Sequence, residues 1–176
     1  DPGHYADVYK QSAISAVSWG EEPTIRVACG PAWAKYHWTE TLMKNAHEYM
    51  EGLALHAYTI PREWKEKGPS IEFTEDDWFK ALIKSVEIEE MIDKHSAIMD
   101  RYDPDMRVAL VVDEWGTWYE PLPGYTKMSH YQANTVRDAV VAGFMLNTFN
   151  NHCDRLRMAN IAQLVNVLQC MAHVDR

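Results

Sequence analysis

The chain has little cysteine, no long apolar run and few basic residues, and each shortage excludes a class of protein. Its three cysteines form no Cys-x-x-Cys pair and leave one over in any disulfide scheme. Free thiols in a reducing, cytoplasmic compartment are therefore expected. No stretch approaches the roughly 18 to 20 uninterrupted apolar residues that a membrane span requires, so no membrane partner is predicted. No signal-peptide pattern is visible at the first residue.

The shortage of basic residues argues against nucleic acid as a partner. The chain has 17 Lys and Arg against 26 Asp and Glu, a net charge of −9, whereas a phosphate backbone requires a basic surface. Cofactor motifs are also missing: there is no Gly-x-Gly-x-x-Gly, no His-Glu-x-x-His and no Gly-rich phosphate loop. We therefore expect neither a metal nor an organic cofactor.

Aromatic residues, by contrast, are abundant. Seven Trp and nine Tyr occur in 176 residues, and many gather in segments whose Pro, Gly and charge content is typical of loops. Aromatic rings can simply fill a core. Rings in loops, however, are what a sugar-binding cleft uses, because the C–H faces of a furanose or pyranose stack on them.

Helical and strand patterns alternate four times along the chain, which predicts an α/β fold with a parallel sheet. Helices are expected over residues 4–19, 38–50, 74–101 and 131–152. Strands are expected near residues 24–29, 52–57, 107–113 and 155–162. An open doubly wound sheet and part of a (β/α)8 barrel both fit. Polar and aromatic residues follow several strands, as in a barrel active site, so we favour the barrel, although four strands cannot close one.

The helix expected from residue 74 has the clearest signals. Thr74 and Asp77 have the spacing of a capping box. A stripe of residues at three- to five-residue steps predicts its buried face. The stripe consists of Trp78, Leu82, Val86, Met91, His95 and Met99.

The most informative stretch is VVDEWGTWY, residues 111–119, in which an apolar strand is expected to end in two acids followed by aromatic residues. An acid at a strand end can simply solvate a loop. Because the strand before Glu114 is apolar and the following loop is aromatic, we expect Glu114 to lie in a cleft. A carboxylate beside sugar-stacking rings suits the nucleophile or the acid/base of a glycosidase.

A second pair of candidates ends the preceding strand. His56 and Tyr58 leave that strand on the same side, because alternate residues share a face. For His56 the alternative is a core histidine whose ring nitrogens are satisfied by neighbours. Tyr58 is expected to donate a hydrogen bond to the Glu114 carboxylate and thereby hold its orientation.

Several motifs together closely resemble the α-L-arabinofuranosidases of glycoside hydrolase family 51. The resemblance covers the chain from about Tyr5 onward, in order and without obvious gaps. Its motifs are VACGP (27–31), YHWTE (36–40), GLALHAYT (52–59), IMDRYDP (98–104), VVDEWGTWYEP (111–121) and YQANTVRDAVVAGFMLNTFNNHCDRLRMANIAQLVNVLQ (131–169).

The resemblance implies a fold and an activity. Residues 1–176 would be part of a (β/α)8 catalytic domain, about strands 5 to 8, with the first half of the barrel and a β-sandwich domain absent. The activity implied is release of terminal α-L-arabinofuranosyl residues from arabinan- or arabinoxylan-type polysaccharides with retention of configuration. The partner implied is an arabinose-containing oligosaccharide or polysaccharide, with no cofactor and a homo-oligomer for the full-length enzyme.

The resemblance also implies roles for particular residues. Glu114, in the Asp-Glu-Trp-Gly motif, corresponds to the catalytic nucleophile, and Tyr58 to the tyrosine that contacts it. Trp118 and Gln163 correspond to residues that line the arabinose subsite, and His56 to a further substrate-binding histidine.

The acid/base residue of the family lies in a Gly-Asn-Glu motif, and no such motif occurs in the 176 residues. Glu40 falls at a helix start and Glu51 at the wrong end of a strand, so neither is expected to replace it. We expect the acid/base Glu just before Asp1, and little hydrolysis by the chain alone. The alternatives are an endo-β-glucanase on a related barrel and a non-catalytic carbohydrate-binding fragment.

Overall fold

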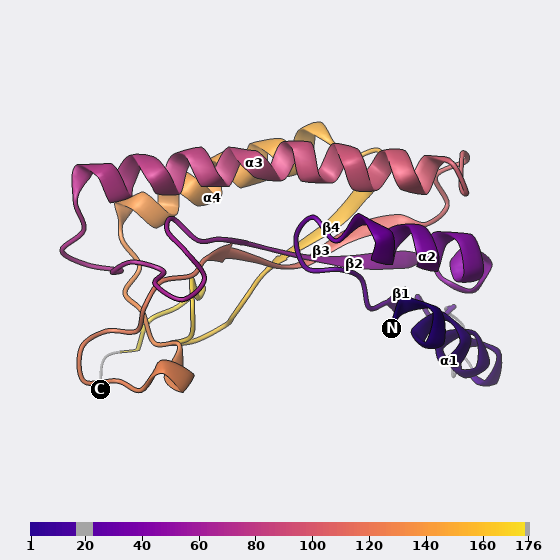
Figure 1. The fold of residues 1–176 in the computed structure, drawn as a ribbon, viewed down its shortest axis with the longest axis horizontal. Helices are drawn as coiled ribbons and strands as arrows, with labels where there is room; N and C mark the ends of the chain where they lie inside the picture. The colour runs from indigo at the N-terminus through magenta and orange to yellow at the C-terminus, as the bar shows by residue number, and fades with distance from the viewer. Residues whose placement is uncertain (17–22, 175–176) are drawn as a thin grey trace. The chain divides into compact units, whose positions relative to one another are not determined.

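The computed structural model describes residues 1–16 and 23–174, in which helices and strands alternate (Figure 1). The four strands form one sheet in the order β1-β2-β3-β4, as the predicted parallel α/β fold requires. In chain order the elements are α1 (Pro2–Ser15), β1 (Val27–Ala28), α2 (Tyr36–Ala46), the 3-10 helix η1 (His47–Tyr49), β2 (Gly52–Thr59), α3 (Glu75–Asp100), β3 (Ala109–Thr117), the 3-10 helix η2 (Lys127–Ser129), α4 (Val136–Asn151) and β4 (Leu156–Ile161).

The residues group into two compact units, and several elements contribute to both. The first unit comprises Asp1–His56, Met91–Val112 and His152–Met158. The second comprises Ala57–Glu90, Asp113–Asn151 and the residues from Ala159 onward. The candidate residues Tyr58, Glu114, Trp118 and Gln163 all belong to the second unit, whereas His56 belongs to the first.

Strand β3 runs further than the sequence predicts. A strand over residues 107–113 was expected, with Glu114 at its end, but β3 extends from Ala109 to Thr117. The backbone N–H of Ala162 donates to the Trp115 carbonyl at 3.3 Å, which continues the pairing past the acids. Glu114 therefore lies inside the strand. Trp115, expected in a loop, is buried and packs edge-on against Phe149 with ring centroids 5.1 Å apart.

Strand β1 is shorter than its apolar sequence suggests. The expected strand, residues 24–29, is reduced to Val27–Ala28. The N–H of Arg26 donates to the carboxylate of Glu51 at 2.7 Å, and the guanidinium of Arg26 binds the same carboxylate at 2.6 Å. The Arg26 N–H is thus satisfied by a side chain, whereas the Arg26 carbonyl accepts from the backbone N–H groups of Glu51 and Gly52 at 2.9 and 3.2 Å.

The helices follow the predicted ranges with changed ends. Helix α1 ends at Ser15, and residues 17–19 of its predicted range lie outside the described residues. Helix α2 stops at Ala46 and is followed by the 3-10 helix η1. Helix α4 begins at Val136, five residues after the predicted start at 131. Its start is set by Thr135, whose N–H and hydroxyl both donate to Asp138, at 2.7 and 2.9 Å.

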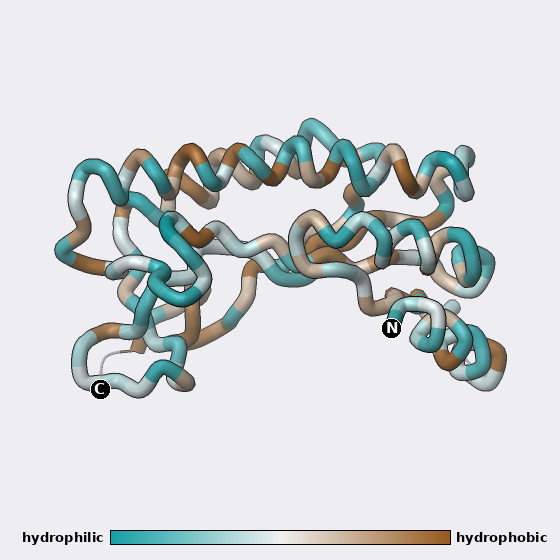
Figure 2. The backbone as a smooth tube through the Cα atoms, viewed as in Figure 1, coloured by the Kyte–Doolittle hydropathy of each residue, from teal (hydrophilic) through white to brown (hydrophobic). Residues whose placement is uncertain are grey.

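The capping box expected at α3 is present. The N–H of Asp77 donates to the Thr74 hydroxyl at 3.2 Å, and the N–H and hydroxyl of Thr74 donate to the Asp77 carboxylate. The expected stripe is only partly correct, because Val86 is 49% exposed. Polar and apolar residues alternate along the helix (Figure 2). The expected stripe shares His95 and Met99 with the buried residues of the helix, which are Asp77, Ala81, Ser85, Ile88, Ile92, His95 and Met99.

His95 anchors the core of the first unit as a neutral imidazole. It is fully buried, its Nε2 lies 3.0 Å from the Trp33 carbonyl and its Nδ1 lies 2.8 Å from the Thr39 hydroxyl. Since a carbonyl can only accept, Nε2 carries the proton and Nδ1 accepts from Thr39. Burial lowers the pKa of His95, because a buried imidazolium loses its hydration.

This arrangement predicts acid-sensitive stability. Because the folded protein holds the pKa of His95 below the unfolded value of about 6.5, the unfolded state binds more protons below that pH. The contribution of neutral His95 to the free energy of unfolding is complete above pH 6.5. It declines as the pH falls toward the folded-state pKa, by at most about 1.4 kcal/mol per pH unit. Urea unfolding at pH 7.5 and 5.0 should show that the free energy of unfolding changes less with pH in His95→Asn than in the parent chain. The exposed His37 is the matched control, and a His37→Asn variant that flattens the dependence equally would contradict the assignment.

A buried ion pair ties the start of β4 to the turn before β3. One guanidinium nitrogen of Arg155 donates to the Asp103 carboxylate at 2.8 Å and to the Val108 carbonyl at 2.9 Å, and the other pairs with Asp100. Burial would raise the pKa of Asp103, but hydrogen bonds from the Val108 N–H and from Arg155 outweigh it and lower the pKa. Leaving one such partner unpaired costs about 3 to 5 kcal/mol.

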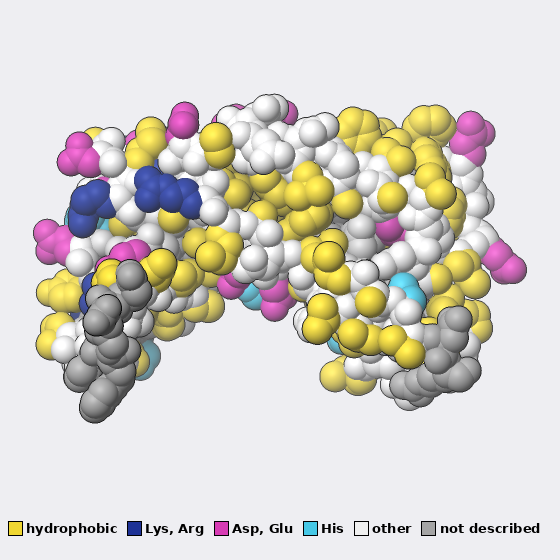
Figure 3. Space-filling view, turned by 180° about the vertical axis from the view of Figure 1, so that it is seen from behind, with side chains coloured by type: hydrophobic (Ala, Val, Ile, Leu, Met, Phe, Trp, Pro, Cys, Tyr) yellow, Lys and Arg dark blue, Asp and Glu magenta, His cyan; other side chains and the backbone are white. Residues whose placement is uncertain are grey.

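Apolar side chains also reach the surface. In the second unit Leu164 is 72% and Met171 is 69% exposed. Figure 3 shows that hydrophobic side chains occupy much of the face it presents. Within residues 1–16 and 23–174, no helix combines the length and the apolar character needed to cross a bilayer.

Candidate active site

The centre of the site is a hydrogen bond between neighbouring strands. The Tyr58 hydroxyl, from β2, donates to Oε2 of Glu114, from β3, at 2.8 Å. The contact expected from the sequence is therefore present. Burial raises the pKa of Tyr58, and the adjacent Glu114 carboxylate raises it further. Tyr58 consequently remains a protonated donor over the whole physiological range and fixes one carboxylate oxygen.

Aromatic rings gather beside Tyr58, with Trp118 at their centre. The Trp118 ring meets Tyr58, Trp64 and His130 edge-on, at centroid distances of 5.0, 5.1 and 5.2 Å. The ammonium group of Lys67 lies 4.8 Å from the centroid of Trp64 and 5.3 Å from that of Trp118. Sequence reasoning singled out Trp118 but missed Trp64 and His130, which lie in the loops before α3 and before α4.

Gln163 shares a pocket with Glu114, as the sequence led us to expect for residues at one sheet edge. The pocket encloses about 290 Å³. Both acids of the Asp-Glu pair line it, together with the last residue of β4 and residues that follow that strand. The lining residues are Asp113, Glu114, Ile161, Ala162, Gln163, Leu164 and Met171. A carboxylate and a side-chain amide facing one small pocket can accept and donate hydrogen bonds to a polyhydroxylated ligand.

His56 is described within the first unit. It is half-buried, and both its backbone N–H and its carbonyl form hydrogen bonds with the segment after β1. Its N–H donates to the Pro31 carbonyl at 3.1 Å, and its carbonyl accepts from the Trp33 N–H at 2.9 Å. A substrate-binding role for His56 stays a prediction.

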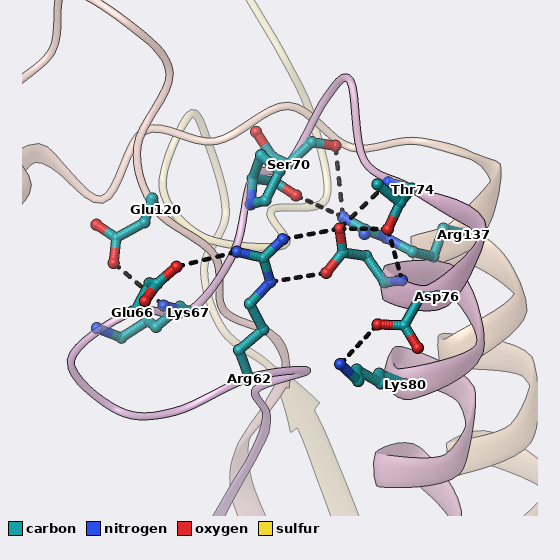
Figure 4. Close-up of polar contacts among 11 residues, drawn as sticks. Arg62, Glu66, Lys67, Ser70, Thr74, Asp76, Lys80, Glu120 and Arg137 are labelled. Carbon is teal, nitrogen blue, oxygen red and sulfur yellow. Dashed lines mark hydrogen bonds and ion pairs between the residues drawn. The ribbon is translucent and has the colours of Figure 1, made fainter.

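The loop that carries Trp64 is fastened at several points (Figure 4). The guanidinium of Arg62 donates to both carboxylate oxygens of Asp77, at 2.7 and 2.9 Å, and to Glu66 at 3.1 Å. The hydrogen bonds from Arg62 lower the pKa of Asp77, so this link remains ionic in mildly acidic conditions. The fastening keeps Trp64 beside Trp118.

The far side of the same loop is held by buried groups. The guanidinium of Arg137 donates to the Pro69 carbonyl at 3.0 Å, and its Cζ atom lies 3.7 Å from the Phe73 centroid and 4.1 Å from that of Tyr119. The N–H of Lys67 donates to Glu120 at 3.2 Å. These contacts hold the segment that places the Lys67 ammonium group beside the rings of Trp64 and Trp118.

The other glutamates considered as acids are engaged in ion pairs within the first unit. Arg26 binds Glu51 and lowers its pKa through a side-chain hydrogen bond. Glu40 accepts from Arg101 at 3.2 Å. A general acid requires a raised pKa, so the lowered pKa of Glu51 argues against that role. In the described part of the chain, no three or more His, Cys, Asp or Glu side chains cluster in a way that could hold a metal ion.

Comparison with protein families gives a match at the region that contains this site. The family model described as "Alpha-L-arabinofuranosidase C-terminal domain" matches residues 113–175, a segment that begins at the Asp-Glu pair. It includes Glu114, Trp118 and Gln163.

Curated relatives match over nearly the whole chain. The "Intracellular exo-alpha-L-arabinofuranosidase" of Bacteroides ovatus is 42% identical over 170 residues, covering 97% of this chain and 33% of the relative. The "Intracellular exo-alpha-(1->5)-L-arabinofuranosidase" of Halalkalibacterium halodurans is 28% identical over 164 residues, covering 84% of this chain and 30% of the relative. The chain thus spans about a third of the length of the curated relatives it matches.

Solved structures of family 51 arabinofuranosidases also match nearly the whole chain. The crystal structure of the GH51 arabinofuranosidase from Xanthomonas axonopodis pv. citri has a TM-score of 0.97 at 46% identity, covering 99% of this chain and 36% of that chain. The structure of a family 51 α-L-arabinofuranosidase from Bifidobacterium longum has a TM-score of 0.79 at 25% identity, covering 100% of this chain and 38% of that chain.

Proposed function

From its homology to the family 51 α-L-arabinofuranosidases, about a third of whose length it spans, we propose that the chain supplies the nucleophile-bearing part of such an enzyme's catalytic barrel. The proposed reaction releases terminal α-L-arabinofuranosyl residues from arabinan- or arabinoxylan-type polysaccharides. The observation that carries the proposal is the Tyr58–Glu114 hydrogen bond beside the Trp118 ring.

In the proposed mechanism Glu114 attacks the anomeric carbon while a second carboxyl group, acting as an acid, protonates the departing oxygen. The C–O bond to the leaving sugar breaks, and a glycosyl ester forms on Glu114. Water, deprotonated by the same second carboxyl group, then cleaves the ester with net retention. Retention requires the two carboxyl groups to be about 5 to 5.5 Å apart. We propose that the second group comes from the part of the family's enzymes to which this chain has no counterpart.

The surrounding side chains have distinct proposed tasks. Tyr58 holds one oxygen of Glu114 so that the other is directed at the anomeric carbon. Trp118 and Gln163 shape the arabinose subsite, and His56 contributes a further sugar contact. Holding the nucleophile in a near-attack geometry lowers the barrier because its orientation is set before reaction.

The activity can be tested in a chimera in which residues 1–176 replace the matching segment of the Xanthomonas axonopodis relative. The TM-score of 0.97 makes this exchange structurally conservative. The chimera should release arabinose from arabinan and hydrolyse 4-nitrophenyl α-L-arabinofuranoside. Cleavage of a cellulose-type glucan without arabinose release would instead favour the endo-β-glucanase. Sugar binding without any hydrolysis would favour a carbohydrate-binding fragment.

Removal of the Tyr58 hydroxyl should weaken catalysis in this chimera. A hydrogen bond to a charged group contributes about 1.5 to 3 kcal/mol, so Tyr58→Phe should lower kcat/KM by roughly 10- to 150-fold. The ring itself and its edge contact with Trp118 would remain. Tyr125→Phe, at a 40% exposed tyrosine, is the matched control and should leave kcat/KM within about twofold of the parent. Equal rates for Tyr58→Phe and the parent would contradict the proposed role of Tyr58.

We also propose a cytoplasmic location. The three cysteines are free in the structure, as a reducing compartment allows. Several curated relatives are named intracellular. The homo-oligomer implied by the resemblance stays a prediction.

A further inference from the structure

The backbone that presents Trp118 is held by side chains. The Trp118 N–H donates to the Thr59 carbonyl at 3.0 Å, and this bond links the end of β3 to β2. On either side of Trp118, the N–H of Thr117 donates to Oε1 of Gln169 at 2.8 Å, and the N–H of Tyr119 donates to Oε1 of Gln132 at 2.9 Å.

Both glutamines use their amide nitrogen as well. Nε2 of Gln132 donates to the Thr117 carbonyl at 3.1 Å, so its one planar amide satisfies two backbone groups two residues apart. Nε2 of Gln169 donates to the Asp138 carbonyl at 2.9 Å, which ties the strand end to α4. Asp138 also accepts from the Thr117 hydroxyl at 2.6 Å.

Burial makes these bonds hard to replace. Gln132 is 0% and Gln169 is 5% exposed, so water cannot readily take over a lost bond. A buried polar group left without a partner costs about 1 to 3 kcal/mol. The neighbouring Gly116 has φ of 123°, and a Cβ at that position would lie 3.1 Å from Oε1 of Gln169. The end of β3 before Trp118 thus packs directly against the Gln169 amide.

We propose that Gln132 and Gln169 are positioning residues of the arabinofuranosidase site. They fix the Thr117–Tyr119 backbone and thereby set the Trp118 ring against the Tyr58–Glu114 pair. A shift of this backbone moves the ring that shapes the sugar subsite and leaves the nucleophile itself unchanged. The inference rests on the proposed function for its catalytic consequence, whereas the placement of Trp118 can be measured without any activity.

The substitution Gln132→Glu provides a pH-dependent test in the chimera. A protonated carboxyl can still accept from the Tyr119 N–H and donate to the Thr117 carbonyl. A carboxylate instead places a second acceptor against that carbonyl. The kcat/KM of Gln132→Glu relative to the parent should therefore be at least tenfold reduced at pH 9 and should recover several-fold by pH 5. Gln132→Met, which can make neither bond, should be reduced at every pH without recovery.

Asn134→Asp is the matched control, because it introduces the same change at a more exposed amide that donates to the Cys170 carbonyl. Its ratio to the parent should stay flat with pH. Parental kcat/KM at every pH for both Gln132→Glu and Gln132→Met would overturn the proposal. Equal pH recovery by Asn134→Asp would overturn it as well.

A second readout is independent of hydrolysis. In protein labelled with 5-fluorotryptophan, the 19F resonance of Trp118, assigned by Trp118→Phe, should shift or broaden in Gln132→Met and Gln169→Met. The resonance of Trp38, in the first unit, should not move. An unchanged Trp118 resonance, or equal changes at both tryptophans, would overturn the proposal. An inactive parent chimera with the expected Trp118 shift would instead count against the proposed function alone.

Discussion

Replacing Glu114 by Gln should lower kcat/KM of the chimera by on the order of 10⁴- to 10⁶-fold, the range seen when single residues of a covalent catalytic unit are removed. The amide has nearly the same shape as the carboxylate and can still accept from Tyr58 at the position of Oε2. It cannot form the glycosyl ester on which retention depends. The loss should therefore appear in kcat, with the folded structure and its thermal unfolding nearly unchanged.

Glu40→Gln is the control for this experiment. Glu40 is an ion-paired glutamate of the first unit with no proposed catalytic role, and its substitution should leave kcat/KM within about twofold. If Glu114→Gln retains more than a few per cent of the parental rate, Glu114 is not the nucleophile. The proposed mechanism would then fail, even if the chimera remains an arabinofuranosidase.

The isolated 176-residue chain should hydrolyse aryl arabinofuranosides about 10²- to 10⁴-fold more slowly than the chimera, the contribution of one general acid/base. The isolated chain is expected to be slower because the proposed mechanism takes the second carboxyl group from the part of the family's enzymes that lies outside the segment matching this chain. Both rates should be measured at the same concentration and pH on 4-nitrophenyl α-L-arabinofuranoside. Turnover by the chain equal to that of the chimera would show that the chain holds its own acid.

A folding failure could also lower the rate of the isolated chain, and two measurements separate the causes. Far-UV circular dichroism should show helix content matching α1 to α4. The Glu114→Gln change should abolish the residual turnover, because that turnover would come from the same nucleophile. Residual turnover that survives the change would come from another site.

Local signals in the sequence predicted the alternation of helices and strands well. The Thr74–Asp77 cap is determined by side chains three residues apart and was therefore predictable. The Tyr58–Glu114 contact was also predictable, because neighbouring parallel strands place the residues near their carboxyl ends side by side. The length of β3 was not, since it depends on pairing with Ala162, which is distant in sequence.

The surroundings of the site depended on contacts between distant segments. Trp64 lies 54 positions before Trp118, and their ring contact depends on a loop fastened by Arg62. Gln132 and Gln169 lie within the segment 131–169 that resembles the family, but the resemblance assigned them no role, because their bonds to the Thr117 and Tyr119 N–H groups join residues that are distant in sequence. The buried face of α3 was also only partly predictable, because Asp77 and Ser85 are polar and yet buried, whereas the apolar Val86 is exposed.

The most direct test of the central claim is azide rescue of Glu114→Gly in the chimera. If Glu114 is the nucleophile, azide enters the vacated space on its side of the sugar, with a single inversion. The product from an aryl α-L-arabinofuranoside should then be the β-arabinofuranosyl azide, identified by NMR, with turnover rising as azide is added. Formation of the α-azide would contradict the claim, because it would place Glu114 on the leaving-group side as the acid/base residue.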